Sequence, residues 1–158
     1  MEVIFFHAGD CKEKSDKSGN QVNLLTRRAE KLTATAAESI YRLRPKKTKV
    51  EVWSNLVPHL AQSAQIIADE LDVKAKIVSA IGQQDMGAVL KMLSSQAKEK
   101  CVIIVGENPY LGLWSDQLMG LKLILHKYSA ASFIVNPQEC VATEFLWFAS
   151  QTALKRIR

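Results

Sequence analysis

Short runs that are apolar at nearly every position recur along the chain. The first, "EVIFF" at residues 2–6, is typical of a strand buried on both faces of a sheet. Similar runs follow as "KVEVWS" at 49–54, "AKIVSA" at 75–80 and "CVIIV" at 101–105. The last is the most hydrophobic of the four. It therefore predicts a central strand.

The segments between these runs have a different period. Apolar residues return every three or four positions, which places them on one side of a helix. Pro45 ends the first such segment, and Pro58 stands near the start of the second, where proline is tolerated. The four apolar stripes are Leu25, Ala29, Leu32, Ala36, Ile40 and Leu43; Leu60, Ala64, Ile67 and Leu71; Met86, Val89, Leu90 and Leu93; and Leu111, Trp114 and Leu118.

The alternation of strands and helices predicts a fold class. Right-handed crossovers between such strands give a mostly parallel central sheet with helices on both faces, a three-layer α/β fold. The runs 131–135 and 143–149 are separated by "NPQEC", so the chain is expected to close with an antiparallel hairpin on the same sheet. One domain over residues 1–158 is expected, with 9–21 as a mobile surface loop.

Composition narrows the function classes. No apolar run approaches the roughly 18 residues of a membrane span, and no secretion signal opens the chain, so a cytoplasmic protein without a membrane partner is expected. The net charge of +5 includes clusters at 44–49 and in the final "KRIR", but neither alternates with aromatic residues. We therefore expect no nucleic-acid partner. Three widely spaced cysteines are interpreted as free thiols, and no cofactor is expected.

Ligands of a parallel α/β sheet bind beyond the carboxyl ends of its strands. His7 follows the first strand, His59 comes just after the second, and Glu107 follows the fourth. These three residues are therefore expected to share one crevice. His126 and Lys127 precede the final hairpin and are expected at its rim, on the surface.

Five short stretches, in order, resemble the histidine phosphatase superfamily and within it the small phosphohistidine phosphatases of the SixA type. The family motifs Arg-His-Gly or Arg-His-Ala, Leu-Thr-x-x-Gly, Arg-Ala-x-Gln-Thr-Ala and Gly-His-Asn-Pro are similar to "FHA" at 6–8, "LTRRA" at 25–29, "HLAQSA" at 59–64 and "GENP" at 106–109. The tail "LWFASQTALKRI" is similar to the closing strand and short basic helix of SixA-type proteins. The resemblance covers nearly the whole chain and implies the histidine phosphatase fold.

The resemblance also implies a chemistry. In the family, the first histidine attacks phosphorus and becomes phosphohistidine, while two arginines and a second histidine hold the phosphoryl oxygens. Here the nucleophile position keeps His7, but Phe6 and His59 stand at the two arginine positions and Glu107 at that of the second histidine. Together with Asn108 of the "GENP" stretch, these are the phosphate-pocket positions. Three of the four groups that act on phosphate are replaced.

Three functions are compatible with these replacements. In the first, phosphatase activity is weak or lost and the domain acts as a binding or interaction module. In the second, the protein is an active phosphohistidine or phosphomonoester phosphatase, with His7 as nucleophile, charged His59 in place of an arginine and protonated Glu107 as acid. In the third, His7, His59 and Glu107 bind a divalent metal ion, because two imidazoles and a carboxylate are a common ligand set.

Simpler roles are also open for the individual residues. Glu107 precedes Pro109 near a helix start, where a carboxylate is stabilised by free backbone N–H groups. His59, also near a helix start, could cap that helix or face water. The partner suggested by the resemblance is a phosphorylated protein or a small phosphorylated or anionic ligand. The oligomeric state is left open.

Overall fold

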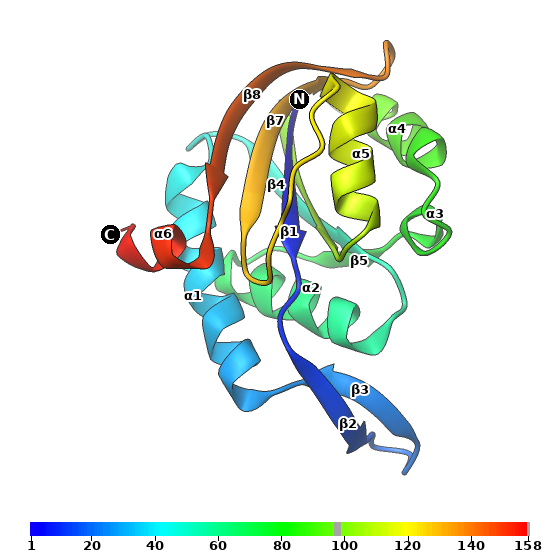
Figure 1. Ribbon diagram of the computed structural model, residues 1–158, viewed down its shortest axis with the longest axis vertical. Helices are drawn as coiled ribbons and strands as arrows, with labels where there is room; N and C mark the ends of the chain where they lie inside the picture. Colours follow the sequence, from blue (N-terminus) through cyan, green and yellow to red (C-terminus); the bar gives the residue numbers. More distant parts are fainter. Residues whose placement is uncertain (97–98, 158) are drawn as a thin grey trace.

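In the computed structural model, which describes residues 1–96 and 99–157, a six-stranded sheet forms the centre of the molecule (Figure 1). Its strand order is β5-β4-β6-β1-β7-β8. Neighbouring strands from β5 to β1 run parallel, whereas β7 runs antiparallel to β1 and β8 antiparallel to β7. The strands are β1 (Glu2–His7), β2 (Cys11–Ser15), β3 (Gln21–Leu25), β4 (Lys49–Ser54), β5 (Ala75–Ile77), β6 (Lys100–Gly106), β7 (Ala130–Asn136) and β8 (Val141–Ala149).

Helices cover both faces of this sheet. The helices are α1 (Arg27–Leu43), α2 (Pro58–Glu70), α3 (Ser79–Gly82), α4 (Met86–Ser94), α5 (Tyr110–Met119) and α6 (Gln151–Arg156). Phe5 and Trp53 point to one face and pack with α3, α4 and α5. Phe6 and Ile103 point to the other and pack with α1, α2 and α6. The predicted three-layer fold, the mostly parallel sheet and the closing antiparallel hairpin are confirmed.

The apolar runs became strands because both of their faces are covered. All six residues of β1 are buried, and so are the last six of β6, which lies third in the sheet as its hydrophobicity predicted. The helix periodicities also hold, except that Leu25, predicted to open the first helical stripe, is the last residue of β3. Thr26 caps α1 by accepting a hydrogen bond from the Ala29 N–H, and α1 ends at Leu43, two residues before Pro45.

Two local predictions were wrong. Residues 9–21 are not a loop, because Cys11–Ser15 and Gln21–Leu25 pair as an antiparallel hairpin that projects from the body (Figure 1). The hairpin has few apolar residues to bury and is held by backbone hydrogen bonds between its two strands. The strand expected over 75–80 ends at Ile77, and the helix α3 takes up its last two residues.

Two observations bear on the composition arguments. No helix among the described residues is long and apolar enough to span a membrane. Cys11, Cys101 and Cys140 are free thiols, as expected from their spacing. Cys101 is buried in β6, whereas the other two are exposed.

Candidate active site

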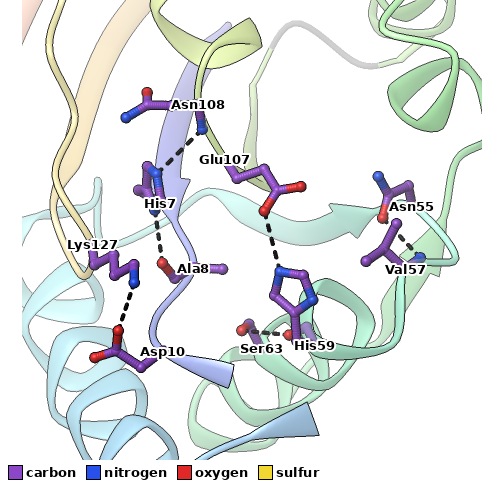
Figure 2. A network of polar contacts seen from close by, with 10 residues as sticks. All are labelled: His7, Ala8, Asp10, Asn55, Val57, His59, Ser63, Glu107, Asn108 and Lys127. Atoms are coloured by element: carbon purple, nitrogen blue, oxygen red, sulfur yellow. Dashed lines mark hydrogen bonds and ion pairs between the residues drawn. The ribbon is translucent and has the colours of Figure 1, made fainter. Parts of the chain in front are cut away.

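Parallel strands bring the three predicted residues to one end of the sheet. His7 is the last residue of β1 and pairs with Gly106, so Glu107 follows directly on the neighbouring strand. His59 is the second residue of α2, which starts after β4, the neighbour of β6 on its other side. Figure 2 shows His7, Glu107 and His59 around the same space. The predicted convergence at the carboxyl ends is therefore observed.

His7 is held almost entirely by backbone groups. Its side chain is buried, and Nδ1 lies 2.7 Å from the carbonyl oxygen of Ala8 (Figure 2). Since a carbonyl can only accept, Nδ1 carries a proton, and Nε2 is free to accept the backbone N–H of Asn108 at 3.2 Å. Burial lowers the pKa of His7 below its usual value, against the opposing effects of the Ala8 hydrogen bond and Glu107. The imidazole is therefore neutral near pH 7, with its lone pair on Nε2.

His59 and Glu107 form a pair of their own. Nε2 of His59 lies 3.2 Å from Oε2 of Glu107, and the two side chains are 12% and 40% exposed. Nε2 donates this bond, because a carboxylate oxygen accepts. The other nitrogen, Nδ1, is buried without a partner among the described residues, so a second proton there would be a buried donor without an acceptor. The pair brings one acidic and one imidazole group to a place where the resemblance implies two cationic phosphate ligands.

This pairing bears on the simpler roles. Helix α5 begins after Pro109 and α2 after Val57, and neither start has a side-chain capping hydrogen bond within the described chain. The Glu107 carboxylate instead contacts His59. Neither residue therefore caps its helix through a side-chain hydrogen bond, and His59, at 12% exposure, does not face water.

The described geometry gives the metal alternative no support. Within residues 1–96 and 99–157, no three His, Cys, Asp or Glu side chains lie in an arrangement that could hold a metal ion. His7 directs its nitrogens to Ala8 and Asn108, while His59 and Glu107 direct theirs to each other. The three groups share a crevice but not a coordination centre.

Phe6 precedes His7 on β1. Its ring is fully buried in the core layer formed with α1, α2 and α6, because side chains alternate across the sheet and His7 takes the other direction. An arginine at this position in the family would supply a charged donor. Phe6 instead supplies an apolar contact to the core and no polar group.

A second ion pair lies on the opposite side of His7. Lys127 Nζ is 2.6 Å from Asp10 Oδ1, and Figure 2 shows this pair across the imidazole from Glu107 and His59. Tyr128 donates its hydroxyl to Asp10 Oδ2 at 3.1 Å and accepts the Asp10 backbone N–H at 3.0 Å. The hydrogen bond from Lys127 lowers the pKa of Asp10, and the same bond raises the pKa of Lys127. Sequence reasoning placed Lys127 at the rim and missed its partner.

Backbone packing fixes the two segments that flank the imidazole. A Cβ on Gly9 would lie 2.1 Å from the ring of Tyr128, and one on Gly106 would lie 2.8 Å from the ring of Tyr110. Only glycine permits these approaches. The Asn108 side chain donates to the carbonyl of Leu125 at 2.9 Å, which anchors the loop whose N–H reaches His7.

Solved structures share this architecture. The protein histidine phosphatase SixA complexed with tungstate aligns with a TM-score of 0.76 and 20% identity, over 98% of this chain and 100% of that chain. A SixA-type protein from Nakamurella multipartitia gives 0.71 and 11%, over 93% and 94%. A mycobacterial glucosyl-3-phosphoglycerate phosphatase in complex with inorganic phosphate gives 0.69 and 10%, over 95% and 98%.

These likenesses establish the fold that the sequence motifs implied. At such identities they do not transfer the activity. A scan against protein-family models and a search of curated proteins give no match to this chain.

Proposed function

We propose that this chain, which has the fold of the histidine phosphatases, is a SixA-like member of that superfamily with weak or lost phosphatase activity that acts as a binding module. The observation that carries the proposal is the 3.2 Å pair between His59 and Glu107. The resemblance assigns these two positions to an arginine and a histidine that hold phosphoryl oxygens. Here they form a pair that contains an acid.

Phosphoryl transfer depends on cationic groups around the phosphoryl oxygens, because charge stabilisation supplies most of the catalysis. Around His7, the carboxylates of Glu107 and Asp10 are anionic, and the nearby amine of Lys127 is already bonded to Asp10. A phosphate dianion would have to displace Asp10 from Lys127 and approach Glu107. Removal of one transition-state donor elsewhere costs about 10²–10³ in rate, so the loss of two arginines predicts a very slow reaction.

A second candidate, an active phosphatase, is favoured by the state of His7. A neutral imidazole with its proton on Nδ1 presents the Nε2 lone pair that nucleophilic attack requires. In this reaction Nε2 would attack phosphorus and the bond to the leaving group would break, with Glu107 donating a proton to that group. Water would then attack the phosphohistidine and release phosphate. For this, Nε2 must first exchange its hydrogen bond from Asn108.

Glu107 and His59 are the weak points of this second candidate. An acid must hold its proton, but the Glu107 carboxylate is 40% exposed to water and accepts a hydrogen bond from His59. A charged His59 would have to leave Glu107 to reach phosphoryl oxygens. We therefore place the binding module first.

The experiment compares purified wild-type protein with His7→Ala. Hydrolysis of a general phosphatase substrate and of a phosphohistidine-bearing protein is measured for both, with His126→Ala as a matched control at an exposed histidine. The proposal expects turnover in all three proteins that is at or only slightly above background. Rapid turnover in wild type and His126→Ala that disappears in His7→Ala would overturn it and select the active phosphatase.

A further inference from the structure

Positive charge gathers along the β5 edge of the sheet, near the end of α1 and the start of β4. Two cavities of about 790 and 460 Å³ adjoin there, because Arg44 lines both. We call this surface the basic groove. Its charged lining residues are Arg42, Arg44, Lys46, Lys49, Lys74 and Lys76, with Glu51 and Asp72.

The basic groove holds most of the chain's excess charge. Six cations and two acids line it, an excess of four, in a chain whose net charge is +5. One of the two acids is already paired, since Glu51 lies 2.6 Å from Lys100 and accepts the indole N–H of Trp53 at 2.9 Å. The rest of the molecule is close to neutral. A localised field of this kind attracts anionic partners.

The lysines of the basic groove are free to meet such a partner. Lys46, Lys49, Lys74 and Lys76 are all exposed, and among residues 1–96 and 99–157 none of them forms an ion pair. Their ammonium groups can therefore bind carboxylates without breaking an internal pair.

Arg44 at the junction of the two cavities is held in place. Its guanidinium lies over the Tyr41 ring, 4.3 Å from the centroid, and donates to the carbonyl oxygen of Pro45 at 3.2 Å. A guanidinium that is fixed before binding loses less conformational entropy when it binds. Arg44 therefore gives the groove one ordered donor among mobile lysines.

The neighbouring strand indicates the shape of the partner. β5 is an outer strand of the sheet, so its free backbone groups can pair with an added extended segment. Lys74 and Lys76 lie at this edge, and Lys76 is exposed above the buried Trp53 ring. Lysines at an edge repel a second copy of the same strand but attract a segment that carries carboxylates.

The groove lining offers little aromatic surface for nucleic acid. Single-stranded nucleic acids bind by stacking bases on exposed aromatic rings. Trp53 is fully buried, and Tyr41, which is 50% exposed, has one face covered by Arg44.

From this geometry we infer that the basic groove binds an extended, Asp- and Glu-rich segment of a partner protein along the edge of β5. This binding does not depend on whether the chain is a phosphatase, because β4 and β6 separate β5 from β1, the strand that carries His7. It gives the domain a docking surface separate from the crevice.

The test titrates a labelled Glu-rich decapeptide into the full chain and measures fluorescence anisotropy at low and at physiological salt. Wild type is compared with the triple variant Lys46→Glu, Lys74→Glu and Lys76→Glu. The matched control reverses three exposed lysines elsewhere, Lys12→Glu, Lys17→Glu and Lys155→Glu. Circular dichroism confirms that all three proteins are folded.

The inference expects salt-dependent binding to wild type, a loss of affinity of about tenfold or more in the groove variant, and a much smaller loss in the control. Three results would each overturn it: no binding to wild type, equal losses in the two variants, or equally tight binding of a single-stranded or duplex oligonucleotide of the same charge. The last result would identify the groove as a general polyanion surface.

Discussion

The crevice has two parts that are held in different ways. The first is His7, whose contacts are with the main chain: its N–H donates to Ser129, its carbonyl accepts from Tyr128, and its ring nitrogens meet Ala8 and Asn108. The second is the charged surroundings, which are side-chain pairs, His59 with Glu107 and Lys127 with Asp10.

This difference indicates that the position of the His7 imidazole and the charges around it can vary independently. Main-chain partners of His7 are present whatever side chains the neighbours carry, as long as the strands pair in the same register. The charge around His7 depends on a few individual side chains. Substitutions at residues 6, 59 and 107 therefore change the electrostatics without moving the imidazole.

The largest effect is expected from Phe6→Ala, which tests whether the ring next to His7 belongs to the core or to the crevice. Phe6 is fully buried, so its truncation should lower the free energy of unfolding by about 3–5 kcal/mol. Urea denaturation at pH 7 measures the loss. Phe148→Ala on β8, where the ring is 42% exposed, is the matched control and should cost clearly less.

A cost for Phe6→Ala no larger than that of the control would mean that the ring packs loosely at the crevice. The contrast between a backbone-held His7 on a well-packed core and variable charged groups around it would then fail, because the strand that carries His7 would itself be loosely packed.

The next largest effect is expected when cationic side chains are placed at residues 59 and 107, beside His7. The double variant His59→Arg and Glu107→His removes a carboxylate and adds a guanidinium group, while the position of His7 is unchanged. Hydrogen bonds to charged groups contribute about 1.5–3 kcal/mol each, so affinity for tungstate or phosphate should rise by roughly 10- to 100-fold. Isothermal titration calorimetry measures it.

The control for this variant carries the same added charge far from His7. Gln138→Lys and Glu139→Gln change two exposed residues of the β7–β8 turn. Equal gains in both variants would show that net charge alone governs anion binding. No gain in either variant would show that the shape of the site, and not its charge, limits anion binding. The claim that side-chain charges around His7 control anion binding would then be wrong.

The sequence predicted those segments of the fold whose buried faces require apolar residues at regular spacings. The strands β1 and β6 and the helix α1 were predicted because their buried faces require apolar residues at fixed spacings. The hairpin of β2 and β3 was missed because it is largely exposed and is held by backbone pairing, with the Leu25 N–H bonded to Gln62.

The site was likewise predictable only in part. Topology alone brought His7, His59 and Glu107 to one end of the sheet. Which of them touch was not predictable, since the bond between His59 and Glu107 depends on side-chain rotamers across 48 positions. The Asp10–Lys127 pair spans 117 positions and follows from the antiparallel pairing of β1 with β7, which no local motif signals.

The smallest effect is expected from protonation of His7, and it tests whether main-chain contacts keep this imidazole neutral. Burial lowers its folded-state pKa below the ordinary 6.5, so the unfolded chain binds more protons than the folded one between these two values. The stability from neutral His7 is thus complete above pH 6.5 and falls as the pH drops toward the folded-state pKa. Urea unfolding at pH 7.5 and 5.5 should show a larger loss in wild type than in His7→Gln.

The comparison with His7→Gln isolates this one group. Glu2, whose pKa is raised by burial, and Asp10 and Glu51, whose pKa values are lowered, are present in both proteins and cancel in the difference. An equal loss in wild type and His7→Gln would mean that folding does not favour the neutral imidazole. The charge state of His7 would then not be set by its main-chain contacts, and the backbone-held half of the comparison would be wrong.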